Sequence, residues 1–169
     1  MRTQNLLGRR LQTLAIGLFA AGTLLAAPAA AYADITVFFG AGHKPETRTA
    51  KGAAFGLTLL AVGFELEYSD ISEKDSAAAP RLRTAMANAI VQTPTAGAQL
   101  YATAGVGMYR ENLRGEFRET NTGLNIGGGL KLNLLGPMKM RVDYRLFRLR
   151  GNALYSTVHR VYAGVSTSF

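Results

Sequence analysis

The chain has 169 residues, with 19 Lys or Arg against 11 Asp or Glu, so its formal net charge is +8 at pH 7. A chain of this length fits one domain. It contains no Cys, which excludes a disulfide framework, a thiolate metal site, a Cys nucleophile and a lipid anchor on Cys.

Residues 1–33 have the pattern of a secretory signal peptide. Three arginines lie in the first ten residues, an apolar stretch follows from Leu11 to Ala27, and small residues come next. Ala31 and Ala33 match the small-x-small motif that precedes a signal peptidase cut. We therefore expect export and cleavage between Ala33 and Asp34. A retained membrane helix is the alternative, and the apolar stretch is short for a bilayer crossing.

The remaining domain, residues 34–169, shows the two-residue period of β-strands. Apolar residues alternate with charged or small ones, as Phe64 and Leu66 alternate with Glu65 and Glu67. The fourth predicted strand is the weakest, because its alanine-rich centre also fits a helix. The eight predicted strands are 35–43, 52–60, 62–70, 81–92, 98–109, 121–134, 138–148 and 158–169.

The predicted connections alternate in length. Those after the second, fourth and sixth strands are short, and the other four are longer and charged: His43–Lys51, Ile71–Pro80, Arg110–Thr120 and Leu149–Thr157. This layout is typical of transmembrane β-barrels, which have short periplasmic turns and longer external loops. An even strand number places both termini on the periplasmic side.

An open sheet edge is not viable in lipid, because each unpaired backbone group costs several kcal/mol there. The last strand must therefore pair with the first. We predict an all-β fold: an eight-stranded, antiparallel, up-and-down transmembrane β-barrel. Eight strands leave an interior that side chains can fill, which disfavours an open diffusion channel.

Charged residues within the predicted strands share one parity, opposite to the apolar row. A lipid-facing Arg or Lys near the membrane midplane costs about 2–4 kcal/mol, so these residues belong inside the barrel. We predict a buried ionic cluster in which Glu65 and Glu67 face Arg141 and Lys131. A polar core is one interpretation, and a gate with switching pairs is the other. The inward charged residues are Glu65, Glu67, Lys131, Lys139, Arg141, Asp143, Arg145 and Arg160.

The two histidines raise the question of catalysis. His43 ends the first strand and His159 begins the last, so closure of the barrel should bring them close together. A metal site would need at least a third ligand, and none is evident. Ser156 precedes His159 by three residues, as a serine hydrolase would allow, but the sequence identifies neither the acid nor an oxyanion hole. We predict no enzyme activity, metal or cofactor.

Basic side chains concentrate in the longer connections, where acidic residues are mixed with them. Such residues can bind lipopolysaccharide phosphates through charge-assisted hydrogen bonds, and a merely solvated loop is the alternative. Nucleic-acid binding is not predicted, because the chain has an export signal, no basic helix and interspersed acids. The candidate lipopolysaccharide contacts are Lys44, Arg48, Lys51, Arg148 and Arg150.

Several segments together carry a resemblance to a known family. They are Gly52–Gly56, Glu65–Tyr68, Leu100–Arg110, Asn125–Gly129, Arg141–Arg145 and the terminal Phe169. With them the domain resembles the small eight-stranded outer-membrane β-barrels, which include the OmpA-like membrane domain and opacity-type surface proteins. No Trp is present for an interfacial girdle, a role that the resemblance leaves to Tyr101, Tyr109, Tyr144, Tyr155 and Tyr162.

The resemblance also implies how the protein is assembled and where it resides. Its alternating C-terminal segment looks like the recognition signal of the barrel-assembly machinery. The implied partners are that machinery, periplasmic chaperones, outer-membrane lipid and lipopolysaccharide, and the barrel is expected to be a monomer in the bacterial outer membrane. The residues of the assembly signal are Val161, Ala163, Val165 and Phe169.

Together these features predict an outer-membrane protein with a structural or surface-interaction role. A narrow gated pore and an outer-membrane lipid hydrolase are the alternatives. A soluble periplasmic carrier barrel would need an apolar interior and a polar exterior, which is the reverse of the predicted parity.

Overall fold

The computed structural model describes residues 31–44, 46–74, 78–95, 97–113 and 117–169. Most of the predicted signal peptide, residues 1–30, lies outside the described residues. The strands are β1 (Ala31–His43), β2 (Thr47–Leu59), β3 (Val62–Ile71), β4 (Arg81–Gln92), β5 (Ala98–Leu113), β6 (Phe117–Asn133), β7 (Met138–Leu149) and β8 (Thr157–Ser168).

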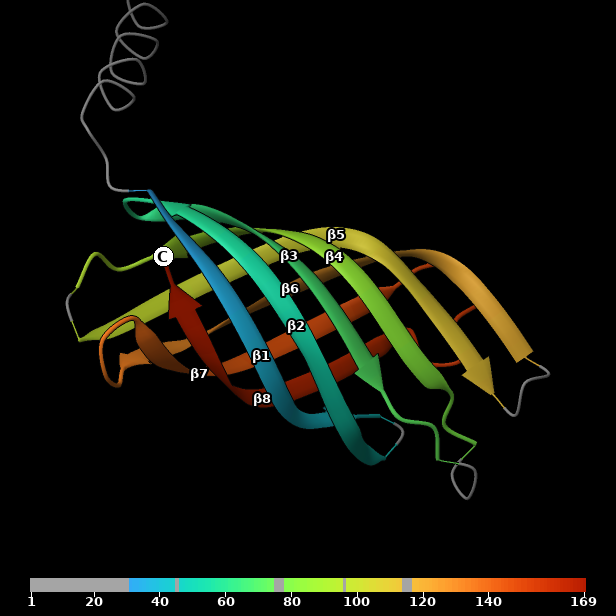
Figure 1. The fold of residues 1–169 in the computed structure, drawn as a ribbon. Helices are drawn as coiled ribbons and strands as arrows, with labels where there is room; N and C mark the ends of the chain where they lie inside the picture. The colour runs from blue at the N-terminus through green and yellow to red at the C-terminus, as the bar shows by residue number, and fades with distance from the viewer. Residues whose placement is uncertain (1–30, 45, 75–77, 96, 114–116) are drawn as a thin grey trace, which may run out of the picture. The chain divides into compact units, whose positions relative to one another are not determined.

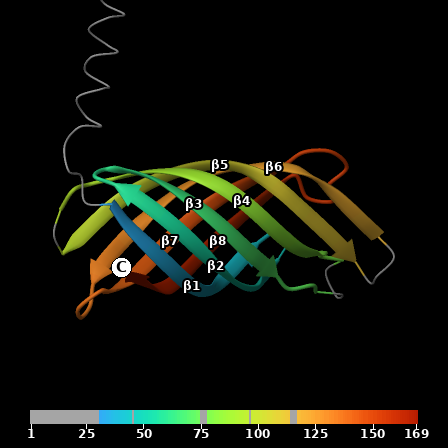
Figure 2. The ribbon, with the colours of Figure 1, turned by 45° about the horizontal axis from the view of Figure 1, so that its top comes forward.

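The strands form a closed barrel in which each pairs with its neighbours in chain order (Figure 1). Antiparallel pairing of β8 with β1, from Asp34 opposite Ser168 to His43 opposite His159, closes the ring. Figure 1 shows β1 between β2 and β8, and Figure 2 shows the barrel from a second direction. The predicted eight-stranded antiparallel barrel is confirmed. The segment with the weakest strand pattern in the sequence, Arg81–Gln92, forms β4.

The barrel has two distinct ends. We call the end that holds the β2–β3, β4–β5 and β6–β7 connections the termini end. There the backbone of Ala33 and that of Phe169 exchange two hydrogen bonds, of 3.1 and 3.0 Å. The opposite end, with the other four connections, is the loop end. Among the described residues no helix is long and apolar enough to cross a membrane.

Several strands are longer than the sequence predicts. β2 begins at Thr47, β5 continues to Leu113, and β6 begins at Phe117. Most of the predicted connections His43–Lys51 and Arg110–Thr120 is therefore strand, which corrects the prediction. The physical reason is that strand pairing uses backbone hydrogen bonds, so charged residues continue a strand where their outward side chains reach water and their inward ones, such as Arg48 and Glu111, are buried in the barrel. A high density of charged residues therefore predicted loops where the structure has strands.

The start of β1 overlaps the predicted signal peptide. Ala31 and Ala33 lie in β1, opposite Leu59 and Leu57 of β2. A cut after Ala33 would remove the first three residues of the strand and make Asp34 the first residue. The cleavage position stays a prediction.

An apolar band covers the outside of the barrel. Phe64, Leu66 and Val106 are 70%, 64% and 59% exposed. On every strand this outward row turns polar toward the loop end. We call these first polar residues the polar ring: His43, Lys51, Asp70, Arg83, Arg110, Thr122, Arg148 and His159.

The interior has two layers of different chemistry. Charged side chains fill the lumen from the termini end as far as Arg145 and Arg160. An apolar cluster lies beyond them toward the loop end and includes Phe147, Leu82 and Tyr109. The sequence did not predict this layer, because its members alternate with outward residues that are also apolar or charged. Its buried members are Ala50, Ile71, Leu82, Met86, Tyr109, Phe147, Leu149 and Val158.

Three of the tyrosines proposed for an outer girdle lie inside the barrel. Tyr101, Tyr109 and Tyr162 are 6%, 1% and 1% exposed, so that part of the prediction is wrong. They occupy inward positions of their strands, where bulk fills the lumen. Tyr144 does face outward, with 47% of its surface exposed, as does Tyr68.

Strand glycines make room for these inner rings. A Cβ at Gly129 would lie 2.5 Å from the Tyr101 hydroxyl and 2.2 Å from the Val142 carbonyl oxygen. A Cβ at Gly40 would lie 2.7 Å from the Cβ of Tyr162. Glycine at these places lets a small barrel hold large side chains.

The apolar cluster should behave as a packed core. Phe147→Ala would leave a cavity there, and we expect a loss of about 3–5 kcal/mol in the free energy of unfolding. Phe39→Ala, on the outside, should cost less, because detergent fills the space. Urea unfolding of the refolded protein in micelles, followed by heat-modifiable gel migration, measures both. Equal losses would contradict a packed inner layer.

Candidate functional site

The centre of the barrel is an ion-pair network between β7 and β3. Arg145 Nη2 lies 2.7 Å from Glu65 Oε1, and Arg141 forms an ion pair with the same carboxylate. Asp143, between the two arginines on β7, accepts from Arg141 Nη2 at 3.1 Å and from Arg145 Nε at 3.1 Å. These strands lie opposite one another in the ring of eight, so the network spans the lumen.

A second part of the network joins β8 to β3. Arg160 Nη2 lies 2.8 Å from the Glu67 carboxylate, and Arg145 Nη1 lies 2.9 Å from it. The Arg160 guanidinium also lies over the rings of Phe38 and Phe147, at 4.8 and 4.9 Å from their centroids. Cation–π contacts of this kind are strongest where water is excluded. Arg160 thus joins the charged layer to the apolar one.

We call these six residues the ionic cluster: Glu65, Glu67, Arg141, Asp143, Arg145 and Arg160. Three guanidinium groups face three carboxylates, and no member is more than 3% exposed. Buried charges are strongly unfavourable unless they are paired and hydrogen-bonded. The formal neutrality of the cluster is therefore what lets it fill the barrel.

Two lysines predicted for the cluster lie outside it. Lys131 Nζ pairs with Asp34 Oδ2 at 3.0 Å, toward the termini end, and not with Glu65 as predicted. Lys139 is half-buried and lies opposite Asn133 and Ser166. The tilt of the strands displaces residues that the sequence alone places at one height. Asp34, predicted only as a cleavage neighbour, is 6% exposed and serves as the counterion of Lys131.

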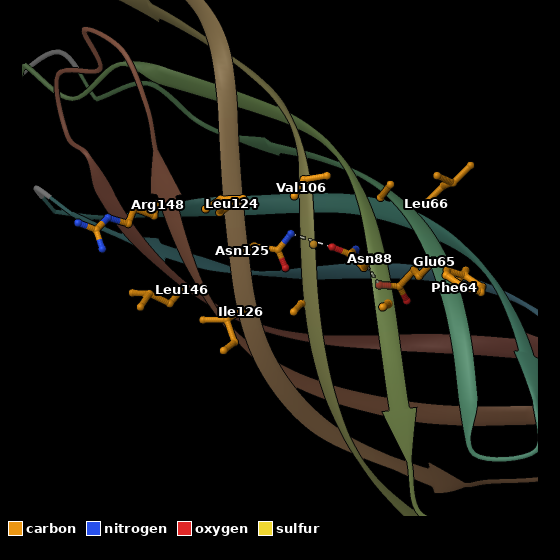
Figure 3. A pocket seen from close by; sticks show the side chains of 14 residues that line it. Phe64, Glu65, Leu66, Asn88, Val106, Leu124, Asn125, Ile126, Leu146 and Arg148 are labelled. Atoms are coloured by element: carbon orange, nitrogen blue, oxygen red, sulfur yellow. Dashed lines mark hydrogen bonds between the residues drawn. The ribbon is translucent and has the colours of Figure 1, made fainter. Parts of the chain in front are cut away.

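Neutral side chains extend the network around the wall. Asn125 Nδ2 donates to Asn88 Oδ1 at 2.7 Å, and Asn88 lies 3.4 Å from the Glu65 carboxylate (Figure 3). The Tyr101 hydroxyl donates to Asp143 and accepts from Arg141 Nε at 2.6 Å. These residues were not predicted from the sequence as part of the cluster, although their inward parity is a signal that could have identified them.

At the loop end, Arg48 is turned into the barrel. It is 5% exposed and donates to the backbone carbonyls of Pro80, Ser72 (3.3 Å) and Lys44 (2.9 Å). The prediction of Arg48 as a lipopolysaccharide contact is therefore wrong, because inward parity on β2 makes it a tie between two connections. The other candidates Lys44, Lys51, Arg148 and Arg150 are exposed.

The histidines lie side by side at the loop end. His43 is opposite His159 across the β1–β8 pair, as closure of the barrel requires. His159 Nδ1 lies 2.6 Å from the Tyr144 hydroxyl, and His43 Nδ1 lies 3.0 Å from Thr47 Oγ1. Over the described residues no acid completes a triad with His159 and Ser156, and no group of three metal-ligating residues occurs.

The predicted assembly signal lies on the outer face of β8 and beyond its end. Val161, Val165 and Phe169 are 51%, 40% and 69% exposed, and Ala163 shares their face. An exposed apolar row that ends in an aromatic residue is available to another protein during folding.

No protein-family model matches the chain, and no curated protein sequence matches it. Several solved structures are similar to the chain. Neisserial surface protein A has 17% identity and a TM-score of 0.67, with 82% of this chain and 97% of that chain covered. The N-terminal barrel of Pseudomonas aeruginosa OprF has 20% identity, a TM-score of 0.63 and the same coverage.

A third similar structure is the Yersinia pestis outer-membrane protein Ail in a phospholipid nanodisc. It has 13% identity and a TM-score of 0.53, with 83% of this chain and all of that chain covered. The chain thus has the fold of the small eight-stranded outer-membrane barrels. At these identities the likeness concerns the fold.

The ionic cluster should be sensitive to charge imbalance. Arg145→Met leaves three buried carboxylates with two arginines, and we expect a loss of about 3–5 kcal/mol in stability. Adding Glu65→Gln should recover part of it, since neutrality returns. A double-mutant cycle from urea unfolding measures the coupling. The control Lys139→Met lies outside the cluster and should change little. Simple additivity of the two cluster substitutions would contradict the network.

Proposed function

We propose that the chain is a bacterial outer-membrane protein with a structural or surface-interaction role. The observation that carries this proposal is the polarity of the barrel, which is apolar outside and filled by paired charges inside. An apolar exterior suits hydrocarbon and is unfavourable in water. The fold shared with outer-membrane proteins supports the same location.

Transport is not the role that the interior favours. An ion would have to pass the ionic cluster and then the apolar cluster around Phe147 and Leu82, which are each 1% exposed. A switch of ion pairs opens only the first of these layers. We therefore favour a closed barrel over a gated pore as the function of the interior.

Catalysis is not favoured either. His159 bonds to a tyrosine hydroxyl, and the structure brings no acid to it among the described residues. We infer that the exposed loop end acts by binding. Its basic residues Lys44, Lys51, Arg148 and Arg150 are suited to the phosphates of lipopolysaccharide or to another anionic surface.

The remaining parts of the proposal concern biogenesis. Residues 1–33 direct export, cleavage follows Ala33, and both mature termini lie in the periplasm. The barrel-assembly machinery recognises the C-terminal row that ends at Phe169, after periplasmic chaperones have delivered the chain. The barrel closes on itself without a second copy, which supports a monomer.

Location and orientation can be tested together in a Gram-negative host. An epitope inserted after Gly151, at the loop end, should be labelled on intact cells, and the protein should fractionate with the outer membrane. The matched control is the same epitope after Leu135, at the termini end, which should be labelled only after permeabilisation. Recovery as a soluble periplasmic protein, or the reverse labelling, would refute the proposal.

The closed interior can be tested in planar bilayers. The refolded protein should give no stepwise current, and Arg141→Glu should stay closed because the apolar cluster still blocks the lumen. Heat-modifiable migration on gels shows whether each variant is folded. Single-channel steps from the wild type, or their appearance in folded Arg141→Glu, would favour the gated pore.

A further inference from the structure

Three arginines gather on the outer face of the barrel at the loop end. Arg81 and Arg83 lie on β4, and Arg110 lies on β5 directly opposite Arg83. With Asn112 they line a cavity of about 170 Å³. A water molecule takes about 30 Å³, so the cavity has room for a group of several heavy atoms. We call these three residues the arginine site.

Like charges placed opposite one another on paired strands are destabilising unless something neutralises them. Asp70 forms an ion pair with Arg81 and lies 3.6 Å from Arg83 Nε. Lys51 also attracts the Asp70 carboxylate, and Glu73 attracts the Arg81 guanidinium, both through charge. Among the described residues, four basic side chains (Arg81, Arg83, Arg110 and Lys51) thus lie around two carboxylates, those of Asp70 and Glu73.

One donor in the site is also unsatisfied by the protein. Arg83 Nε is buried and has no hydrogen-bond partner among the described residues. Arg110 Nε donates to Thr120 Oγ1 at 3.2 Å, which fixes its guanidinium beside the cavity. An excess of positive charge among the described residues, an open cavity and a donor whose ion-pair partner Asp70 lies beyond hydrogen-bond distance together indicate a site for an anionic group such as phosphate.

The same two strands carry a shallow apolar groove next to the arginine site. Its floor holds the small side chains Ala85, Ala87, Ala89 and Ala104, together with Val106. Larger residues of β3 and β6 form its walls, including Phe64, Leu66, Leu124 and Ile126. It consists of two overlapping hollows of about 830 and 710 Å³. Figure 3 shows the residues that line the larger one. We call it the alanine groove.

The groove and the arginine site are in line. Arg83 follows Ala85 on the outward row of β4, and Arg110 follows Met108 on that of β5, a step of about 7 Å. The apolar row from Leu100 to Met108 spans about 21 Å along the barrel axis, from a rise of about 3.4 Å per residue and a tilt of about 40°. A ligand that fits has an anionic head, and its acyl chains run along the outer-leaflet half of this row.

We propose that the β4–β5 wall binds lipid A, the phosphorylated and acylated glycolipid of the outer leaflet. A lipid A phosphate lies in the arginine site, and acyl chains lie in the alanine groove. The inference rests on the proposed function, because it needs the loop end to face outward. It assigns lipid recognition to Arg81, Arg83 and Arg110, whereas the residues at the tips of the loops remain free for other surfaces.

The test is a titration of the refolded, detergent-solubilised protein with purified lipid A, followed by native mass spectrometry. Arg83→Gln with Arg110→Gln should weaken binding by about tenfold or more, since charge-assisted hydrogen bonds are lost. Ala87→Phe with Ala104→Phe, which fills the groove, should weaken it without changing the charge. The control Lys74→Gln with Lys139→Gln removes the same charge from residues outside both proposed lipopolysaccharide contacts and should leave affinity unchanged.

Two further ligands separate the possible outcomes. Dephosphorylated lipid A should bind weakly, and inorganic phosphate should not displace lipid A. Equal loss in the control pair would mean that only general charge matters, and strong competition by inorganic phosphate would reduce the site to a free-anion site. Either result overturns the inference. Cell fractionation and epitope labelling of the same variants report on membrane location independently, so the two proposals can fail separately.

Discussion

The balance of six buried charges is the constraint on which the rest of the structure depends. Arg141, Arg145 and Arg160 are tolerable inside the barrel only because Glu65 and Glu67 reach them from β3 and Asp143 lies between two of them on β7. The network ties β3 to β7 and β8 and fills space that eight strands leave small. With the charged face of each strand held inside, the apolar face must lie outside, and only a closed ring leaves no unpaired edge for lipid to meet.

Because the interior is filled, the surfaces available for function are the loop end and the outer face of the barrel. Two interior layers block the lumen, so the barrel is best suited to hold a shape in the membrane and present its loop end. The polar ring marks where the apolar band stops, and on β4 and β5 it is enriched in arginine. A lipid-facing site there and free loops above it would let one small barrel contact its own membrane and another surface at once.

The two-residue period was enough to predict eight strands and the inward row, because parity survives errors in strand ends. It could not fix which inward charges meet. Lys131 pairs with Asp34 and not with Glu65, since strand tilt shifts heights around the ring. Arg48 was predicted to be a loop cation because the sequence placed it in the connection before β2, whereas β2 begins at Thr47 and its parity turns Arg48 inward. The arginine site was missed because Arg81, Arg83 and Arg110 come together only through the β4–β5 register.

The most direct test of the account uses the absence of Trp from the chain. Phe38 and Phe39 are neighbours in β1, yet one is 5% exposed inside the barrel and the other 64% exposed outside. Single Phe38→Trp and Phe39→Trp variants, refolded into bilayers with brominated acyl chains, place a fluorophore on each face. The account predicts strong bromine quenching at position 39 and little at position 38. Equal quenching, or the reverse order, would contradict a barrel with its apolar face toward lipid.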